Sequence, residues 1–256
     1  AAFDSAAIDA TITVFMLLAG TNFGIYYLLL NKKQGWAPLR DTELWTYLAI
    51  FVASTLVVTW TLLERTSGDI LHALRLASFQ VSSLVTSTGF ATDDFNVYPP
   101  LSRGLLMVLM FVGAMGGSTA GGYKVSRLLI ALSAAVQEIR HVIHPKAVFT
   151  TRVGGRGMDE RVVHAAMALL VITLVLLVLS TLSLCAMGLS VETALSASMT
   201  AIANSGPGLN ELGPLGNFAA IPDPGKVILS LLMVLGRLEC YTMLALLVPG
   251  FWRGGR

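Results

Sequence analysis

Long apolar runs alternate with short polar stretches along the chain, and the longer runs have the length of membrane-spanning helices. A helix needs about 20 apolar residues to cross a bilayer. Four runs reach this length plainly, namely Ile12–Leu30, Leu44–Leu63, Val162–Met187 and Val227–Val248. A fifth run, Leu101–Ile130, is long enough, but glycines are concentrated at its centre. The pattern therefore predicts five spans, the fifth of which is interrupted.

Two further apolar runs, Ile70–Val85 and Val191–Ala203, are too short or too polar to cross a bilayer. Each is followed at once by a polar stretch that contains glycine, Thr86–Phe90 after the first and Asn204–Gly208 after the second. We predict that both runs are short helices that enter the membrane and return to the side from which they came.

The positions of the charged residues support this arrangement. If the ends of the first, fifth and last spans lie inside the cell, twelve of the seventeen basic residues lie inside with them. Acidic residues such as Asp69, Asp93 and Glu192 then lie outside, which is the bias expected of a membrane protein. Because full crossings by the two short runs would mix the charges, both runs are predicted to enter from outside.

Composition agrees with a chain surrounded by a lipid bilayer. Apolar residues make up 55% of the sequence and charged residues only 12%, with a mean hydropathy of +0.73. Soluble domains carry about a quarter charged residues, and a β-barrel would alternate apolar and polar positions rather than show continuous runs. The predicted fold class is an all-α integral membrane protein. The net charge of +2 is not gathered into a stripe, so no nucleic-acid partner is expected.

The order of the runs indicates a repeated unit of span, short re-entrant helix, polar loop and span. Residues 44–130 contain this order once, and residues 161–250 contain it again. The first span is expected to close a preceding unit whose start is missing from this sequence. The predicted organisation is a final helix and cytosolic linker in 1–43, a repeat in 44–140, a cytosolic connector in 141–160 and a second repeat in 161–256.

The two polar loops are candidates for binding a cation. Irregular backbone at membrane depth leaves carbonyl oxygens without partners, and a cation filter uses such oxygens in place of the hydration shell of the ion. Thr86, Ser87 and Thr88 add hydroxyl groups without charge, and Gly89 can adopt a left-handed or extended conformation. The segment from Asn204 to Gly208 has the same ingredients. The alternative is that both are ordinary turns outside the membrane.

The centre of the fifth run is expected to leave the helical conformation. Glycine costs about 1 kcal/mol relative to alanine inside a helix, and five glycines lie within ten positions: Gly113, Gly116, Gly117, Gly121 and Gly122. We predict a flexible intramembrane loop beneath the filter. The alternative is close packing of an intact helix through small residues spaced by four.

Two basic residues lie near this segment or in the last span. An arginine at the centre of a span costs about 3 kcal/mol on insertion scales, so Arg237 should face protein or water. It is expected to bind freed carbonyls of the glycine segment or act as a positive barrier, and an ordinary buried ion pair is the alternative. Lys124 is either a second member of the same gate or a side chain that reaches to the membrane interface.

Four ordered motifs resemble a known family. They are Thr-Ser-Thr-Gly-Phe-Ala-Thr (86–92), Gly-Gly-Ser-Thr-Ala-Gly-Gly-Tyr-Lys-Val (116–125), Asn-Ser-Gly-Pro-Gly-Leu (204–209) and Gly-Arg-Leu-Glu (236–239). Together they resemble the Trk/Ktr/HKT superfamily of potassium transporters, and most closely the membrane subunit of the bacterial Trk system. The resemblance implies four span–pore-loop–span repeats around one pore, of which this chain would be the C-terminal half.

The resemblance also implies roles for individual residues. The carbonyls of eight residues would coordinate K⁺ in the filter: Thr86, Ser87, Thr88, Gly89, Ala203, Asn204, Ser205 and Gly206. Residues 113–122 would be the intramembrane gating loop, and Arg237 the arginine of the pore. Ser87 stands where the family often has Thr, and Ala203 where it often has Asn, so side-chain support of the filter is expected to be weaker.

The implied function is potassium uptake across the bacterial inner membrane through a gated, channel-like pore. The expected partners are the missing N-terminal half or a second chain, a second copy in a homodimer, and a cytosolic nucleotide-binding TrkA-like subunit that contacts connectors such as 131–160. No cofactor is expected in this chain, and K⁺ is the transported ion. A sodium-permeable relative and an ion-coupled secondary transporter with broken helices remain as alternatives. An enzyme is not expected, because the spans offer no catalytic set of polar residues.

Overall fold

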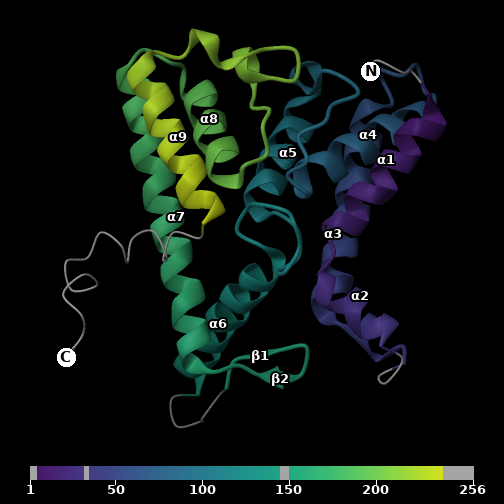
Figure 1. Cartoon of the computed structure of the whole chain (residues 1–256), viewed down its shortest axis with the longest axis vertical. Helices are drawn as coiled ribbons and strands as arrows, with labels where there is room; N and C mark the ends of the chain where they lie inside the picture. Colours follow the sequence, from purple (N-terminus) through teal and green to yellow (C-terminus); the bar gives the residue numbers. More distant parts are fainter. Residues whose placement is uncertain (1–4, 32–34, 145–149, 239–256) are drawn as a thin grey trace.

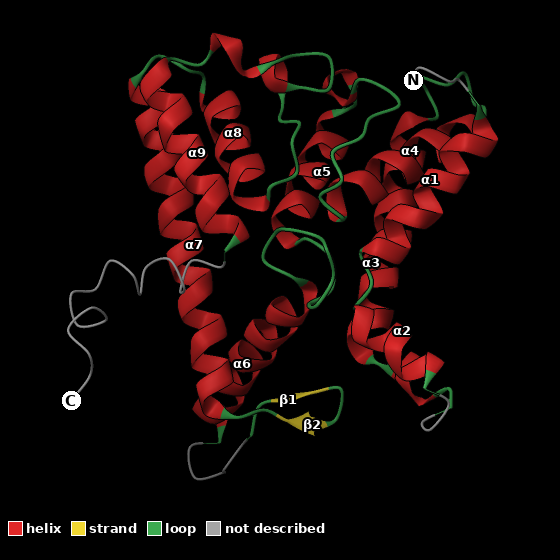
Figure 2. Ribbon diagram, viewed as in Figure 1, coloured by secondary structure: helices red, strands yellow, loops and turns green. Residues whose placement is uncertain are grey.

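A computed structural model describes residues 5–31, 35–144 and 150–238 of the chain. These residues are mainly helical and include one small β-hairpin (Figures 1 and 2). The α-helices are α1 (Ala6–Ala19), α2 (Phe23–Leu30), α3 (Thr42–Leu62), α4 (Ile70–Val85), α5 (Pro100–Val112), α6 (Val125–Ile143), α7 (Glu160–Ala186), α8 (Val191–Ala203) and α9 (Asp223–Arg237). Short 3₁₀ turns are η1 (Ala37–Arg40), η2 (Phe95–Val97), η3 (Asn210–Leu212) and η4 (Phe218–Ala220), and the strands are β1 (Arg152–Val153) and β2 (Arg156–Gly157).

Several helices begin at a polar residue that accepts a hydrogen bond from the first turn. The Glu43 N–H donates to Oδ1 of Asp41 at 2.7 Å before α3, and the His72 N–H donates to Oδ1 of Asp69 at 3.0 Å before α4. Ser190 caps α8 in the same way. Such caps contribute about 1 kcal/mol each, and they explain where the apolar runs become helical.

The predicted spans at Leu44–Leu63 and Val162–Met187 are confirmed as the continuous helices α3 and α7. In the part of the chain that the structure describes, these two helices are long and apolar enough to cross a membrane. α7 leaves Val171, Val178 and Leu182 exposed along its length. A row of exposed apolar side chains on such a helix is suited to contact with lipid.

The predicted short helices are confirmed with the same bounds as the runs from which they were predicted. α4 packs against α3 and α5, and α8 packs against α7 and α9. α5 also contacts α8 and so joins the two groups of helices, as the middle of Figure 1 shows. α1 is tied to α4 by an ion pair, in which Nε of Arg75 donates to Oδ2 of the buried Asp9 at 2.7 Å.

The prediction of one continuous span at Ile12–Leu30 is wrong. The run is broken into α1 and α2, which are bent by 87° relative to each other. At the break, a Cβ on Gly20 would lie 2.8 Å from Cγ2 of Thr86, so only glycine fits beside the first polar loop. Asn22 then starts a new helix, because its Oδ1 accepts a hydrogen bond from the Gly24 N–H at 2.7 Å.

The predicted interruption of the fifth run is confirmed. α5 ends at Val112 and α6 begins at Val125, with non-helical backbone between them. Gly113 and Gly122, at the two ends of this segment, have φ angles of 73° and 76°, which side chains disfavour. The alternative of an intact helix packed through its glycines is therefore wrong.

The described parts of the basic connector contain a helix and a hairpin. Residues 131–143 continue α6, so the helix extends past the predicted boundary at residue 140. β1 and β2 then pair antiparallel, with Arg152 opposite Gly157 and Val153 opposite Arg156. The turn between them has positive φ angles at Gly154 and Gly155, as tight hairpin turns require.

The last predicted span is described only in part. α9 covers it as far as Arg237, which is the final residue of the helix rather than its middle. Residues 239–248 of the predicted span, and Glu239 of the fourth motif, lie outside the described residues.

Candidate functional site

The first polar loop leaves the C-terminus of α4 through a tight turn. The Ser87 N–H donates to the Leu84 carbonyl at 3.2 Å, and the Thr88 N–H donates to the Ser83 carbonyl at 2.9 Å. Ser87 and Gly89 have φ angles of 55° and 77°. Backbone whose φ alternates in sign in this way carries its carbonyls away from helical pairing.

The second polar loop leaves α8 with the same hydrogen bonds. The Asn204 N–H donates to the Ala201 carbonyl at 3.3 Å, and the Ser205 N–H donates to the Thr200 carbonyl at 3.1 Å. The φ angles of Asn204 and Gly206 are 53° and 99°, matching the signs at Ser87 and Gly89. Two sequences that share only the Ser/Thr and Gly character of the loop thus adopt one backbone pattern.

The two loops lie against each other. A Cβ on Gly89 would collide with the Ser205 carbonyl oxygen and lie 3.1 Å from Cδ of Pro207. Only a residue without a side chain allows this approach, which brings the backbones of the predicted filter residues of both loops together.

Hydroxyl groups brace both loops. Thr86 and Thr88 share a hydrogen bond of 2.8 Å between their Oγ1 atoms, and Thr200 Oγ1 and Ser205 Oγ share one of 2.9 Å. These bonds fix the side chains without adding charge near the carbonyls. Asn204, next to Ala203, is also held by α9, because its Nδ2 donates to the Met233 carbonyl at 3.1 Å.

The glycine segment 113–124 lies directly against both loops. A Cβ on Gly121 would collide with the Ala203 carbonyl oxygen and would lie 3.4 Å from Oγ of Ser87. The ends of the segment also touch each other, because a Cβ on Gly113 would collide with the Gly121 carbonyl oxygen. The segment is therefore a closed loop pressed against the residues where α4 and α8 end.

Basic side chains bind the freed carbonyls of this loop. Nζ of Lys124 donates to the Ala120 carbonyl at 2.6 Å and contacts the Met115 and Ser118 carbonyls at 3.4 Å each. Nη1 of Arg237, from the end of α9, donates to the Thr119 carbonyl at 3.2 Å. The predicted contact between Arg237 and the glycine segment is confirmed, and of the two interpretations of Lys124 the structure shows the one that places it against this segment.

Glu43 of α3, which no sequence motif singled out, binds the loop and the first turn of α6 together. Its Oε1 accepts hydrogen bonds from the Gly116 N–H at 2.6 Å and from the Ser126 N–H at 3.0 Å. The second bond supplies the cap that the first turn of α6 lacks locally. A glutamate in the first turn of an apolar helix resembles an ordinary dipole contact, so no local signal distinguished it.

Backbone groups at the break between α1 and α2 also bind the glycine loop, a contact that no sequence motif indicated. The Met115 N–H donates to the Gly20 carbonyl at 3.1 Å, and the Phe23 N–H donates to the Gly117 carbonyl at 3.2 Å. The backbone freed by one broken helix is thus paired with the backbone freed by the other, as a membrane environment requires.

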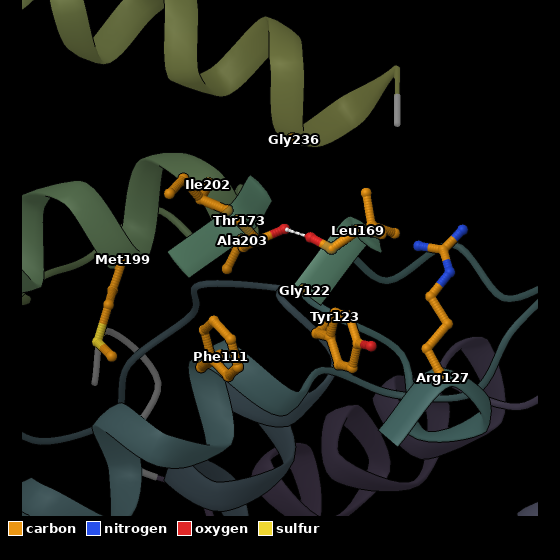
Figure 3. A pocket seen from close by; sticks show the side chains of 10 residues that line it. All are labelled: Phe111, Gly122, Tyr123, Arg127, Leu169, Thr173, Met199, Ile202, Ala203 and Gly236. Carbon is orange, nitrogen blue, oxygen red and sulfur yellow. Dashed lines mark hydrogen bonds between the residues drawn. The ribbon is translucent and has the colours of Figure 1, made fainter. Parts of the chain in front are cut away.

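A small cavity of about 30 Å³ adjoins the loop on the side of α7 (Figure 3). The rings of Phe111 and Tyr123 stack in it with centroids 6.0 Å apart, and the Tyr123 hydroxyl donates to the Ala166 carbonyl of α7 at 2.8 Å. These contacts hold the end of α5 and the end of the glycine loop together and bind them to α7. Ala203 and Gly236 are also among the lining residues, so the cavity lies between the loop and the ends of α8 and α9.

A family model described as TrkH, a cation transport protein, matches residues 1–249 of the chain. The chain belongs to the TrkH family. Family membership and the membrane-length helices α3 and α7 place it in the bacterial inner membrane as a multi-pass protein.

Relatives in this family are named potassium uptake proteins. The chain is 34% identical over 254 residues to the Trk system potassium uptake protein TrkH of Salmonella typhimurium, covering 98% of the chain and 52% of the relative. It is 35% identical over 243 residues to the Trk system potassium uptake protein TrkI of Halomonas elongata, covering 94% of the chain and 49% of the relative. The chain therefore spans about half the length of the curated relatives it matches.

A solved structure in the family has the same fold. The crystal structure of the potassium transporter TrkH from Vibrio parahaemolyticus matches with a TM-score of 0.89 at 34% sequence identity. The match covers 98% of this chain and 54% of that one. The helical arrangement described above is therefore that of a TrkH transporter over nearly the whole chain.

Proposed function

We propose that this chain supplies half of a gated pore that takes up K⁺ across the bacterial inner membrane. The observation that carries the proposal is the meeting of three segments at one point: two loops of matching backbone, which touch at Gly89 and Ser205, and a glycine segment lying against both. The names of the relatives supply the ion, since they are potassium uptake proteins.

In this proposal the filter uses backbone carbonyls in place of water around the ion. The oxygens belong to the eight residues of the two loops, Thr86, Ser87, Thr88, Gly89, Ala203, Asn204, Ser205 and Gly206. α4 and α8 both end at these loops, so the negative ends of two helix dipoles point at the ion. Dipoles without a full charge favour entry of a cation and still allow its release.

The order of elements supports two span–pore-loop–span repeats. α3, α4, the first loop and α5 form one, and α7, α8, the second loop and α9 form the other. The chain then provides two of four filter strands. The other two come from the remaining half of a longer polypeptide or from a second chain, in keeping with relatives about twice as long.

The gate in this proposal is the glycine loop together with the two basic residues that hold it. Gly113, Gly116, Gly117, Gly121 and Gly122 allow the backbone to move without side-chain clashes, while Lys124 and Arg237 stabilise the closed position through the carbonyls of Ala120 and Thr119. Opening requires the loop to leave the Ala203 carbonyl and to exchange these hydrogen bonds for others.

Regulation would reach the gate from the cytosolic side. α6 begins at the end of the loop, and the hairpin that follows it packs on the start of α3, where a Cβ on Gly154 would lie 2.6 Å from Oγ1 of Thr42. A TrkA-like nucleotide-binding subunit that binds residues 131–160 would therefore act on the glycine loop through α6 and through the start of α3. We propose a homodimer of the complete protein as the assembly, with no enzymatic activity and no cofactor in this chain.

The test is ⁸⁶Rb⁺ uptake into proteoliposomes that contain the complete protein, with K⁺ or Na⁺ as competitor. We expect K⁺ but not Na⁺ to block uptake, and Gly89→Ser to weaken the preference because its side chain displaces the Ser205 carbonyl. Unchanged preference in Gly89→Ser would contradict the filter assignment. Equal competition by both ions in the unmodified protein indicates a sodium-permeable pore, and uptake that needs a proton or sodium gradient indicates a coupled transporter.

A further inference from the structure

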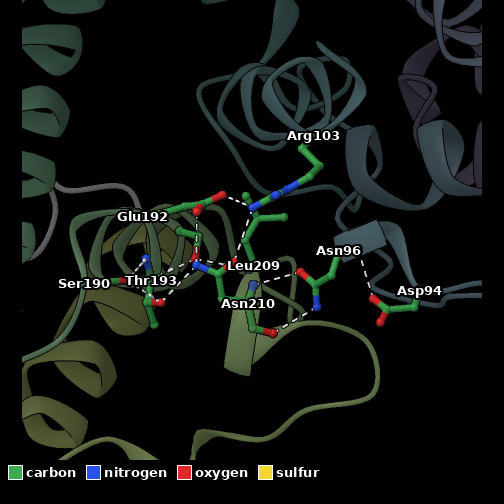
Figure 4. A network of polar contacts seen from close by, with 9 residues as sticks. Asp94, Asn96, Arg103, Ser190, Glu192, Thr193, Leu209 and Asn210 are labelled. Atoms are coloured by element: carbon green, nitrogen blue, oxygen red, sulfur yellow. Dashed lines mark hydrogen bonds and ion pairs between the residues drawn. The ribbon is translucent and has the colours of Figure 1, made fainter. Parts of the chain in front are cut away.

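A polar network joins the two loops beyond the filter residues, on the side from which α4 and α8 enter (Figure 4). At its centre, Asn96 in η2, which follows the first loop, and Asn210 in η3, which follows the second, exchange two hydrogen bonds. Nδ2 of Asn96 donates to the Asn210 carbonyl at 2.9 Å, and the Asn210 N–H donates to Oδ1 of Asn96 at 2.8 Å. The side-chain amide thus takes the place of a neighbouring strand and pairs fully with the backbone of the other loop.

The backbone that follows the second loop is constrained at this contact. Asn210 has a φ angle of 56°, which is uncommon for a residue other than glycine. A Cβ on Gly213 would collide with Nδ2 of Asn96, so the amide fits only because this position is glycine. A positive φ at a residue such as Asn210 persists only where the surrounding structure imposes it.

Arg103 of α5 extends the network to α8. Its Nη2 pairs with Oε1 of Glu192, at the start of α8, and lies 3.3 Å from Oδ1 of Asn210. Nδ2 of Asn210 in turn donates to Oε2 of Glu192 at 3.2 Å and to Oγ1 of Thr193 at 3.2 Å. The helix after the first loop is therefore tied to the helix before the second loop, with Asn210 held between them.

Each loop is also fastened to its own short helix close to this network. Nε2 of Gln80 in α4 donates to the Asp93 carbonyl at 2.8 Å, three residues before Asn96. The Leu209 N–H donates to Oγ of Ser196 in α8 at 3.1 Å, one residue before Asn210. A displacement at the Asn96–Asn210 contact is thus transmitted to the returning limbs of both loops.

We infer that Asn96, Asn210 and Arg103 are positioning residues that set the separation of the two filter loops and thereby the preference for K⁺ over Na⁺. The inference rests on the proposed filter. K⁺ and Na⁺ differ in size, so a ring of carbonyls distinguishes them only if its segments resist moving together or apart. The network adds a polar link between two segments of the ring, which also meet where Gly89 contacts Ser205 and where α5 packs against α8.

The first test is Asn96→Ala in the complete protein, because both hydrogen bonds of the Asn96 side chain go to the Asn210 backbone. The matched control is Asn217→Ala, which removes another asparagine of the second loop whose side chain accepts only a local bond from the Ala219 N–H. The ratio of inhibition by K⁺ and by Na⁺ is measured by ⁸⁶Rb⁺ uptake, and size-exclusion chromatography confirms folding.

We expect Asn96→Ala to lower the K⁺/Na⁺ ratio at least about fivefold, which is the lower end of the factor to which the loss of two hydrogen bonds corresponds. Asn217→Ala should leave the ratio unchanged. A change in uptake rate without a change in the ratio would mean that the network only stabilises the fold, and would overturn the inference.

Gly89→Ser separates failure of this inference from failure of the proposed filter. A lower ratio in Gly89→Ser with an unchanged ratio in Asn96→Ala overturns the network alone, whereas unchanged ratios in both overturn the filter as well. If Asn96→Ala does not fold, the pair Arg103→Glu and Glu192→Arg decides. Arg103→Glu alone should lower the ratio, and the double exchange should restore it; absence of restoration overturns the inference.

Discussion

The helices that follow the two loops begin alike and end differently. α5 and α9 both start after a proline, Pro99 and Pro222, that stands before the first helical residue. α5 stops at Gly113, where the chain turns back into the glycine loop. α9 instead passes Gly236, which packs against the Ile202 carbonyl, and ends at Arg237.

This difference shows that two loops with similar backbone can be followed by helices with different roles. The turns after α4 and α8 have the same pattern of hydrogen bonds, so the two loops leave their helices in the same way. After the first loop and α5, the chain forms the glycine segment 113–124, whose carbonyls lack helical partners. After the second loop and α9, it supplies the guanidinium of Arg237, which binds the Thr119 carbonyl of that segment. The proposed gate therefore needs both repeats, and neither contains it alone.

The largest effect is expected from Gly121→Ala, which breaks the contact between the glycine loop and the second filter loop. Its Cβ would collide with the Ala203 carbonyl oxygen, so the loop must move away from the filter. We expect ⁸⁶Rb⁺ uptake in the absence of a regulatory subunit to rise about tenfold, as a shift of about 1.4 kcal/mol between closed and open states gives. Gly104→Ala in α5 is the matched control, because its Cβ meets no atom within 4 Å. Equal uptake in the two variants would contradict the position of the loop.

A smaller effect on K⁺ preference should distinguish Gly89 from Gly206, the two glycines of the proposed filter. Gly89→Ala and Gly206→Ala both place a side chain at positive φ, which costs about 1 kcal/mol. Only the Cβ at Gly89 collides with the neighbouring loop, whereas the Cβ at Gly206 lies 3.9 Å from Cα of Gly89. The competition assay should therefore show a greater loss of K⁺ preference in Gly89→Ala. Equal losses would mean that backbone strain, and not the contact between loops, determines selectivity.

The smallest effect is expected at the tip of α9. Arg237→Ala removes the hydrogen bond to the Thr119 carbonyl, and a charged donor of this kind is worth about 1.5–3 kcal/mol when water cannot replace it and less when it can. Because Arg237 is exposed in this chain, we expect unregulated uptake to rise about threefold rather than tenfold. Arg237→Lys should retain part of the effect, and uptake lower than in the unmodified protein would indicate that Arg237 assists conduction instead.

Local patterns were sufficient to predict the spans α3 and α7, the short helices α4 and α8 and the interruption near Gly113. Run length, capping residues and glycine density act within a few positions, so they are visible in the sequence. The break in the first run was not predicted, because the groups packed against it come from elsewhere in the chain: a Cβ on Gly20 would lie 2.5 Å from the Tyr47 hydroxyl and 2.8 Å from Cγ2 of Thr86. The two interpretations of Lys124 could not be decided from the sequence, since its partners are carbonyls that become available only when the loop folds around it.

The sequence by itself determined that the chain is a helical membrane protein with two polar loops of one kind and a glycine-rich segment between them. Hydrophobic length and backbone propensity decide these features, and both are properties of neighbouring residues. Only the tertiary structure decided which groups meet: Glu43 with the two ends of the glycine loop, Arg237 with Thr119, and Asn96 with Asn210. Such contacts join residues far apart in the chain, and each is made when packed helices carry isolated polar groups to backbone that has lost its helical partners.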